Sequence, residues 1–156
     1  MNSFGTDEYI ENIVESYSLS LLKTAYAILR NTQDAEDAVQ ETFLKLIKKQ
    51  PFFKDKNHEK AWLLRVTINN AKNILRFSKR SDIEYNENFV TSAAERSDIL
   101  NEVLSLPEKY RTVIHLYYYD GYSIKEIAKI LCKPQATVGT ILARGRKMLK
   151  LSLEGD

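Results

Sequence analysis

One stretch of the chain has a basic and amide-bearing face and contains no acidic residue. Between Lys60 and Arg80 the sequence has no Asp or Glu. Side chains at steps of three or four residues share one side of an α-helix. Those on this face are Arg65, Asn69, Lys72, Arg76 and Lys79. A solvated Lys/Arg face is the common fate of such residues, but it usually includes acids. The pattern therefore favours a polyanion partner such as nucleic acid.

A second basic helix is predicted near the C-terminus, after a sequence typical of a helix-turn-helix. Ser123 and Glu126 match a capping box, Cys132 to Pro134 supplies a turn, and the next helix begins near Gln135. In this motif the second helix enters the major groove N-terminus first, and its cations contact phosphates. Those cations are Arg144, Arg146 and Lys147. A purely structural helix pair has the same pattern and stays an alternative.

Apolar residues at helical spacing predict the elements that position these side chains. The first stripe consists of Ile10, Ile13, Val14, Tyr17, Leu21, Ala25 and Ile28. After possible capping oxygens at 31–34, the second consists of Ala35, Ala38, Val39, Thr42, Phe43, Leu46 and Ile47, and Pro51 ends that helix. The third runs from Glu59 to about Lys79, with Leu64, Ile68, Ala71, Ile74 and Leu75 facing inward.

Charge divides the 156-residue chain into three parts. The net charge is +3 over residues 1–80, −5 over 81–102 and +4 over 103–156, which sum to the overall +2. The middle part has no sustained apolar period until a helix expected near Ala93, so it cannot bury a core of its own. We therefore expect an all-α fold: two small helical domains, 1–80 and 103–156, joined by an acidic linker over 81–102. The second domain contains the helix-turn-helix.

The composition argues against several other classes of protein. Five Gly and three Pro leave few turns for a hairpin-rich protein. The single cysteine, Cys132, and the isolated His58 and His115 do not supply a zinc site or an internal disulfide, so we expect a cytoplasmic protein without a cofactor. No segment approaches the roughly 18 apolar residues of a spanning helix, so we expect no membrane insertion.

Catalysis is also not expected. Acids that could be imagined as metal ligands gather at the start of the second helix, but no histidine joins them; they are Asp34, Glu36, Asp37 and Glu41. The chain has neither a Gly-rich phosphate loop nor a nucleophile motif. We therefore predict that the protein is not an enzyme.

Four motifs in order give the chain a family resemblance. They are DAEDAVQETFLKL at 34–46, AWLLRVTINN at 61–70, LPEKYR at 106–111 and SIKEIA at 123–128. Together they resemble bacterial sigma factors of the sigma-70 family, in the extracytoplasmic-function (ECF) group. Each motif is moderately specific by itself, but four in register over about 120 residues are highly specific. The family's two helical domains joined by a linker agree with the division by charge.

The resemblance implies roles for the N-terminal residues. Segment 34–46 resembles region 2.2, which in the family docks on the clamp helices of the RNA polymerase β′ subunit. The candidates for that contact lie off the buried stripe: Asp37, Gln40, Glu41 and Leu44. The helix dipole would explain the acids but has no use for an exposed Leu44.

The loop at 52–58 and the basic helix after it resemble regions 2.3 and 2.4, which open the −10 element and hold a flipped base. The candidates for −10 binding are Lys54, Asn57, Arg65, Asn69, Lys72, Arg76 and Lys79. Phe52, Phe53 and Trp62 could equally belong to the core, and core is the preferred interpretation for Trp62.

The last helix resembles region 4.2, which recognises the −35 element, but departs from the usual Gly-Thr-Val-Lys-Ser-Arg-Leu pattern. Ala136, Gly139 and Ile141 replace the Gly, the basic residue and the Arg. Cys132 stands where the turn often has Gly, and we interpret this as a less strained turn. The −35 candidates are Gln135, Thr137, Thr140 and Ala143, with Arg144, Arg146 and Lys147 on phosphates. The −35 preference should differ from the group's commonest one.

The resemblance implies as partners the core RNA polymerase, through the β′ clamp helices and the β flap, and promoter DNA. Family members often have an anti-sigma factor too, usually membrane-bound. The rival function is a stand-alone helix-turn-helix transcriptional regulator. It explains residues 106–150 equally well, but it explains neither the N-terminal motifs nor the basic face from Arg65 to Lys79.

Overall fold

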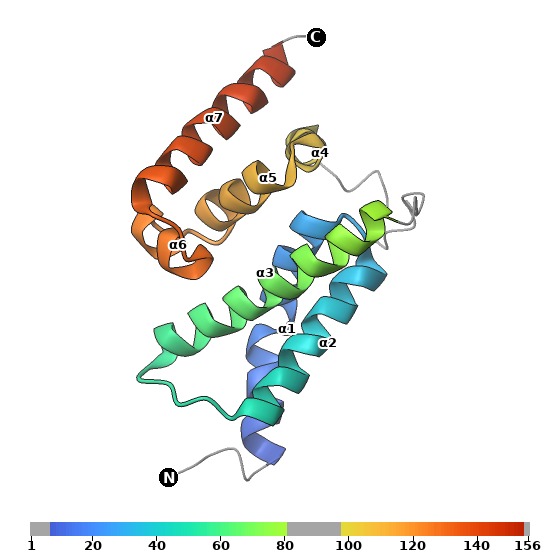
Figure 1. Ribbon diagram of the computed structural model, residues 1–156, viewed down its shortest axis with the longest axis vertical. Helices are drawn as coiled ribbons and strands as arrows, with labels where there is room; N and C mark the ends of the chain where they lie inside the picture. The colour runs from blue at the N-terminus through green and yellow to red at the C-terminus, as the bar shows by residue number, and fades with distance from the viewer. Residues whose placement is uncertain (1–6, 81–97, 155–156) are drawn as a thin grey trace. The chain divides into compact units, whose positions relative to one another are not determined.

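The computed structural model describes residues 7–80 and 98–154, and the side chains of 7–77 and 100–150. Every regular element in these ranges is helical, which confirms the all-α expectation (Figure 1). The chain divides into two compact units, Met1–Tyr85 and Asn86–Asp156, which are described separately below.

Over residues 7–80 the first unit contains three helices, α1 (Asp7–Leu29), α2 (Thr32–Lys49) and α3 (Lys56–Arg80), each of which packs against the other two. Their apolar stripes meet in one core, and burial of each large side chain contributes about 1.5–3 kcal/mol. The largest fully buried side chains are Leu21, Ile28, Leu46, Leu63, Leu64 and Ile68.

Local signals set the ends of α2 where the sequence predicted them. The Asn31 side chain accepts a hydrogen bond from the Asp34 backbone N–H at 3.0 Å, which makes Asn31 the N-cap. At the other end Gln50 adopts a left-handed conformation and donates its N–H to Leu46 O, and Pro51 follows. These turns set where the exposed residues of α2 and the loop after it begin.

A buried polar network joins α2 to α3. Thr42 and Thr67, both fully buried, share a hydrogen bond of 2.8 Å between their hydroxyls. Thr42 also donates to Ala38 O at 2.8 Å, and the Asn70 amide donates to the same carbonyl at 3.4 Å. Because buried polar groups are costly unless paired, this network fixes the register between the two helices.

The second unit contains α4 (Asp98–Ser105), α5 (Glu108–Ile114), the π-helical turn η3 (His115–Tyr119), α6 (Ile124–Leu131) and α7 (Gln135–Glu154). Helix α7 packs against α4, α5 and α6 around a core that includes Leu116, Ile127 and Leu142. The predicted capping box opens α6: Ser123 and Glu126 exchange hydrogen bonds of 3.0 and 3.1 Å.

Helix α4 begins inside the segment that we expected to be the acidic linker, 81–102. Residues 98–102 are helical because they begin α4, whose Leu104 is buried and which packs against α5 and α7. The rest of the expected linker, residues 81–97, lies outside the described residues, as does the helix expected near Ala93.

The interpretation of Cys132 as a sign of a less strained turn is wrong. Cys132 is the C-cap of α6 and has a φ of 55°, in the left-handed region. This region crowds the Cβ of any L-residue and is the reason that glycine is favoured there. The turn has the same left-handed geometry that a glycine would give it, but with a steric cost.

Candidate nucleic-acid and polymerase interfaces

The candidate polymerase-binding residues share the solvent-facing side of α2. Asp37, Gln40, Glu41 and Leu44 are all exposed, and Leu44 is 58% exposed. Ile47, which we expected to be buried, is 47% exposed, because it lies about a third of a turn from the centre of the buried stripe. The side of α2 turned to solvent therefore carries two large aliphatic side chains among acidic and amide groups.

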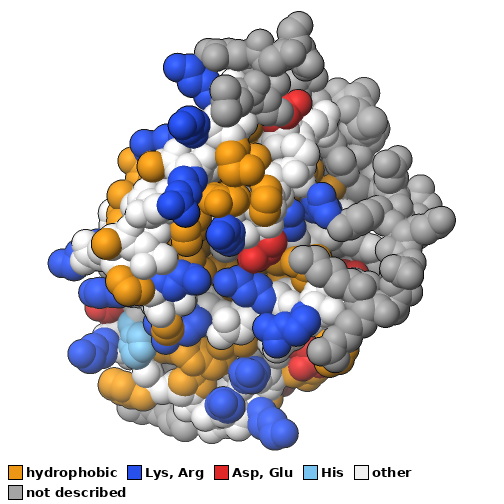
Figure 2. All heavy atoms as spheres, turned by 45° about the horizontal axis from the view of Figure 1, so that its top comes forward, with side chains coloured by type: hydrophobic (Ala, Val, Ile, Leu, Met, Phe, Trp, Pro, Cys, Tyr) orange, Lys and Arg blue, Asp and Glu red, His pale blue; other side chains and the backbone are white. Residues whose placement is uncertain are grey.

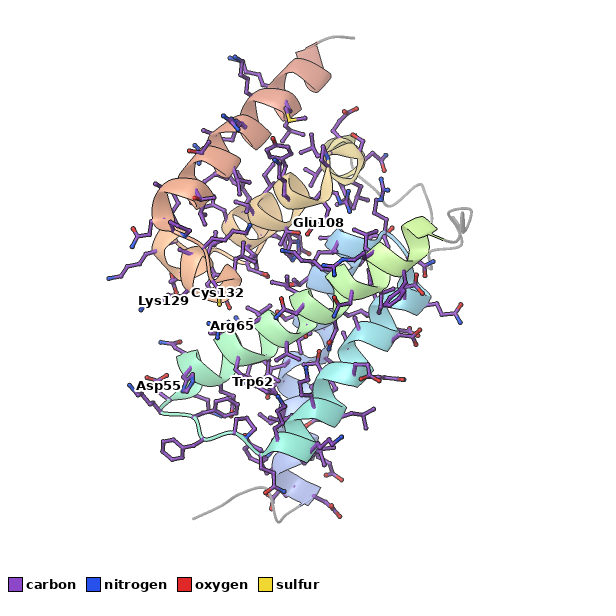
Figure 3. All side chains as sticks on the ribbon, in the orientation of Figure 1. Asp55, Trp62, Arg65, Glu108, Lys129 and Cys132 are labelled. Carbon is purple, nitrogen blue, oxygen red and sulfur yellow. The ribbon has the colours of Figure 1, made fainter. Side chains whose placement is uncertain are left out.

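The loop between α2 and α3 is held by aromatic contacts and short-range hydrogen bonds. The Phe53 ring meets His58 edge-on at 5.3 Å and Trp62 at 5.8 Å between ring centres. The backbone N–H of Lys54 donates to His58 Nδ1 at 3.1 Å, and Asp55 accepts from the His58 N–H at 2.8 Å. Trp62 is half-buried, not a core residue, and lies between α3 and the loop, against Phe53 (Figure 3).

Phe52 lies in this loop and is 85% exposed. Lys54 and Asn57 are also exposed, on the loop and in the first turn of α3. An exposed aromatic ring with a nearby cation is the combination that binds an unstacked base and the phosphate beside it.

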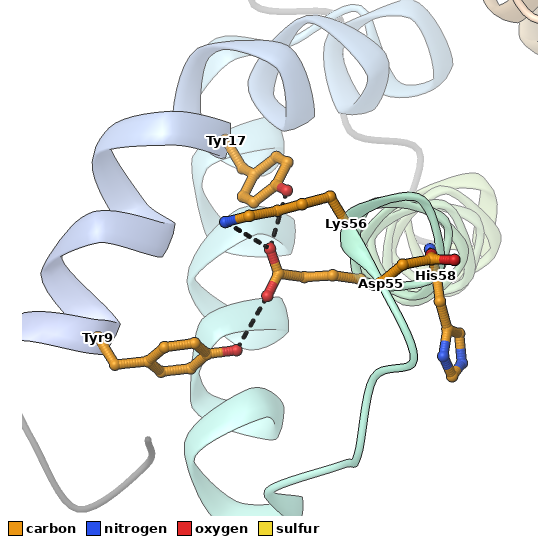
Figure 4. A network of polar contacts seen from close by, with 6 residues as sticks. Tyr9, Tyr17, Asp55, Lys56 and His58 are labelled. Atoms are coloured by element: carbon orange, nitrogen blue, oxygen red, sulfur yellow. Dashed lines mark hydrogen bonds and ion pairs between the residues drawn. The ribbon is translucent and has the colours of Figure 1, made fainter. Parts of the chain in front are cut away.

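A buried carboxylate, which the sequence analysis missed, fixes the start of α3 to α1. Glu59 is 6% exposed and accepts hydrogen bonds from the hydroxyls of Tyr17 at 2.9 Å and Tyr9 at 3.1 Å (Figure 4). Lys56 Nζ lies 3.9 Å from the same carboxylate. Burial and then the hydrogen bond with Glu59 raise the pKa of each phenol to about 12. Glu59 is the only acidic residue in the sequence of α3, and this was the one sign in the sequence that it has a structural role.

The basic face of α3 lies opposite its buried stripe. Asn69 and Arg76 are exposed, while Arg65 and Lys72 are half-buried. Leu64, Ile68 and Ala71 are buried on the other side. The backbone of Lys79 continues the helix, but its side chain lies outside the described ones. The structure therefore brings Arg65, Asn69, Lys72 and Arg76 onto one outward face.

In the second unit all of the candidate −35 residues are exposed on α7: Gln135, Thr137, Thr140, Ala143, Arg144, Arg146 and Lys147. The Thr140 hydroxyl donates to Ala136 O at 3.0 Å, so the oxygen of that hydroxyl can still accept a bond from outside. Gly139 has open space beside it, since apart from its chain neighbours and the backbone of its own helix no atom of the described structure lies within 4 Å of the position that its Cβ would take. The reading end of α7 therefore presents small neutral groups.

Basic side chains also surround the turn before α7. Lys125, Lys129 and Lys133 line a shallow, open hollow together with Cys132, Pro134 and Gln135. Lys and Arg side chains are frequent on the face drawn in Figure 2, where Asp and Glu are few. These charges suit a polyanionic partner.

Arg146 differs from the other cations of α7 in its surroundings. Its guanidinium carbon lies 5.3 Å from the ring centre of Tyr117 and 5.4 Å from that of Tyr118, and its Nε donates to the Tyr118 hydroxyl. The sequence analysis assigned Arg146 to phosphate contacts without any role for these tyrosines. Contacts between residues nearly 30 positions apart leave no sign in local spacing.

Two family profiles match the chain: "Sigma-70 region 2" over residues 13–81 and "Sigma-70, region 4" over residues 96–149. The ECF RNA polymerase sigma factor SigW of Bacillus subtilis is 30% identical over 170 aligned positions, which cover 96% of this chain and 91% of SigW. The ECF RNA polymerase sigma-E factor of Escherichia coli is 30% identical over 137 positions, covering 74% of this chain and 72% of that protein.

Two solved structures share the fold. The sigma factor RpoE of Bartonella quintana, in complex with the anti-sigma factor NepR, superposes with a TM-score of 0.78 at 22% identity, covering 97% of this chain and 99% of RpoE. CnrH, in complex with the cytosolic domain of CnrY, gives a TM-score of 0.72 at 23% identity, covering 97% of this chain and 92% of CnrH.

The chain belongs to the sigma-70 family of transcription initiation factors, with both of the family's helical regions in order. Within the family it is an ECF sigma factor, a promoter-recognising protein, and the stand-alone regulator is not favoured. Across the described helices, none combines the length and the apolar character needed to cross a bilayer.

Proposed function

We propose that this ECF sigma factor binds core RNA polymerase through the exposed side of α2, the −10 element through α3 and its preceding loop, and the −35 element through α7. The boundaries that we propose are 1–80 for region 2 and 98–156 for region 4, because α4 packs with the second unit, so that the linker expected over 81–102 shortens to 81–97. One observation carries the proposal. The chain contains both sigma regions, and each of its two units has one outward basic helix face.

The proposed polymerase contact consists of Asp37, Gln40, Glu41 and Leu44, extended by Ile47. Exposed Leu44 and Ile47 can bury apolar surface in an interface, and the acids beside them can pair with basic groups of a partner helix. The β′ clamp helices are the partner that the family assignment favours for this side of α2. A contact of the β flap with the second unit belongs to the same proposal.

The proposed −10 contact combines aromatic stacking with phosphate binding. Phe52 would stack on an extruded base, and Lys54 and Asn57 lie close to it in sequence. The face of Arg65, Asn69, Lys72, Arg76 and Lys79 would hold the freed strand. Extruding a base costs a few kcal/mol, and stacking on an aromatic side chain returns about 1–3 kcal/mol.

The proposed −35 contact uses neutral groups at the entering end of α7 and cations further along. Gln135, Thr137, Thr140 and Ala143 would meet base edges, while Arg144, Arg146 and Lys147 would meet phosphates. Because Gly139 adds no cation, the preferred −35 sequence should differ from that of relatives with a basic residue there.

We further propose that the chain acts without catalysis or a cofactor of its own, in the cytoplasm where polymerase and promoter DNA meet. The described side chains include no group of three or more His, Cys, Asp or Glu arranged to hold a metal ion.

An anti-sigma factor is a proposed regulator: RpoE was solved with the anti-sigma factor NepR.

In vitro transcription with core polymerase on a library of promoter fragments tests this function. We expect specific start sites only when core and this chain are both present, and no tight binding of double-stranded promoter DNA by the chain alone. Tight, specific binding by the free chain, with no effect on transcription start sites, would instead identify a repressor-like regulator.

A further inference from the structure

A tyrosine pair on η3 constrains one arginine of the recognition helix. Tyr117 and Tyr118 meet edge-to-face, with 4.9 Å between ring centres, and the Arg146 guanidinium lies against both rings. Its Nε donates to the Tyr118 hydroxyl. A surface arginine normally samples many rotamers, whereas two ring faces and a hydrogen bond restrict this one before any ligand binds.

The backbone around this cluster brings α7 close to α5, the helix that leads into η3. Gly145, next to Arg146, is buried, and a Cβ there would lie 2.9 Å from Ile114 Cδ1 of α5. The absence of a side chain at Gly145 therefore lets α7 approach the α5–η3 segment. The turn itself is held by His115, which lies 3.4 Å from an Asp120 carboxylate oxygen and stacks on Tyr119 at 5.1 Å.

The restrained guanidinium keeps donors for a ligand. Arginine has five N–H donors, and only the one on Nε is used in the bond to Tyr118. Among the described side chains, no carboxylate forms an ion pair with Arg146. The four N–H groups of its two terminal nitrogens match the spacing of two oxygens on one phosphate.

The position of Arg146 on α7 favours the DNA backbone over a base. It lies about a quarter of a turn from the centre of the exposed face around Thr140 and Ala143, and about 9 Å beyond Thr140 along the axis. In helix-turn-helix complexes the entering end of the second helix reads bases, whereas later positions and flanks meet phosphates.

We propose that Tyr117 and Tyr118 are positioning residues that hold Arg146 in the orientation for a bidentate contact with one phosphate at the −35 element. The inference rests on the proposed function of α7. The proposed contact differs from a general effect of positive charge, because it depends on the planar guanidinium and on the tyrosine rings that hold it.

The experiment measures the affinity of the reconstituted holoenzyme for a promoter fragment at several salt concentrations. We expect Arg146→Gln to weaken binding by about three- to tenfold and to reduce the salt slope by about 0.9, the loss of one phosphate contact. Arg146→Lys keeps the charge but cannot stack or bind bidentately, so its loss should approach that of Arg146→Gln. The matched control is Lys109→Gln, which removes an exposed cation of the same unit that lies 5.1 Å from the Tyr110 ring centre and outside the proposed −35 contact, and which should change affinity less than twofold.

The tyrosines are tested by coupling. Tyr117→Leu with Tyr118→Leu should weaken binding about as much as Arg146→Gln, and combining all three changes should add no further loss. Tyr118→Phe keeps the ring and should lose less. Thermal unfolding of each variant separates this effect from a folding defect, since a purely structural role would lower the unfolding midpoint without changing the salt slope.

The positioning role would be overturned if Arg146→Gln lowered both the affinity and the salt slope while the tyrosine variants changed neither. Loss of core polymerase binding with DNA contacts intact would overturn it too, by showing that the cluster serves a protein partner. If even the wild-type holoenzyme fails to bind any promoter, the proposed function itself fails, a result distinguishable because all variants then behave alike.

Discussion

At Cys132 a single side chain imposes a steric cost on the turn of the helix-turn-helix. Its φ of 55° places an L-residue where glycine has no penalty. The sequence correctly located the turn from local signals. The capping box of Ser123 and Glu126 marks the start of the helix before the turn, and Pro134 marks the end of the turn itself. The sequence could not give the backbone angle, since the same letters fit several turn geometries.

We predict that Cys132→Gly stabilises the protein by about 1 kcal/mol, because glycine relieves the left-handed strain. Glycine also gains freedom in the unfolded chain, which limits the gain. Denaturant unfolding measures the change. Cys132→Ala is the matched control, because it removes the thiol and keeps the Cβ, so it should not stabilise. Equal stability of the glycine and alanine variants would contradict the strain.

Glu59 illustrates what residue-level reading of a sequence misses. Its partners Tyr9 and Tyr17 precede it by 50 and 42 residues, so the carboxylate looked like one more acid at a helix start. Only the packing of α1 against α3 makes it a buried group with two donors.

This cluster predicts a loss of stability at alkaline pH. The pKa of each phenol is raised from 10.0 to about 12, so between these values the folded state keeps protons that the unfolded state releases. The stabilisation is therefore complete below pH 10 and is lost as the pH rises towards 12.

Denaturant unfolding across this pH range tests the cluster. The double variant Tyr9→Phe, Tyr17→Phe should be less stable at neutral pH by about 1–3 kcal/mol, because Glu59 loses two donors. Its stability should fall less steeply above pH 10, since phenylalanine does not ionise. Glu59→Gln, which keeps both phenols, should give an intermediate slope, whereas identical slopes in all three proteins would rule out this linkage.

At the scale of the element, helical periodicity predicted α1, α2, α3 and α7, because each buries one stripe against neighbours of the same unit. It misassigned Ile47, at the edge of the stripe of α2, and gave no sign of η3, the π-helical turn that continues α5. Both places bear on function: Ile47 extends the proposed polymerase contact, and η3 carries the tyrosine pair.

We expect Asp37→Ala with Leu44→Ala to weaken binding to core polymerase by at least about tenfold, since each removes a side chain from the centre of the proposed contact. Both residues are exposed, so thermal unfolding should be little changed. The matched control on α1 is Glu15→Ala with Leu19→Ala, an exposed acid and an exposed leucine of the same unit. Affinity that falls equally in both double variants would remove α2 from the interface.

Gly139 gives a prediction about α7. The site is open, so Gly139→Arg should be accommodated and should raise helix stability by about 0.5–1 kcal/mol. Its cation should move the −35 preference toward that of relatives with a basic residue at this position. Gly139→Ala separates the two effects, because it gains helix propensity without a charge. A promoter-library selection that finds the same −35 preference in all three proteins would show that position 139 does not read DNA.

At the scale of the whole molecule, charge counted by segment predicted the two units, because each basic part needed its own apolar stripes and the acidic part had none. It placed the start of the second unit too late: α4 begins at Asp98, since a short amphipathic helix with three charged or amide side chains still buries Leu104. Charge counted by segment cannot locate this helix, because Asp98 and Glu102 put its first turn in the acidic part.

The division into two units predicts how DNA-binding variants combine. Arg76 is exposed on α3 in the first unit, and Lys147 is exposed on α7 in the second. Each proposed phosphate contact therefore belongs to a different unit. Free energies of separate sites add within about 0.5 kcal/mol, and each lost phosphate contact reduces the salt slope by about 0.9.

Arg76→Gln with Lys147→Gln should therefore weaken holoenzyme binding to a promoter by the product of the two single effects, and reduce the salt slope by about 1.8. Binding titrations at several salt concentrations measure both quantities. The control pair is Lys72→Gln with Arg76→Gln, one turn apart on α3, whose effects are expected to couple because neighbouring cations serve the same stretch of backbone. Coupling stronger than about 1 kcal/mol between Arg76 and Lys147 would mean that the two units do not bind the promoter as independent modules.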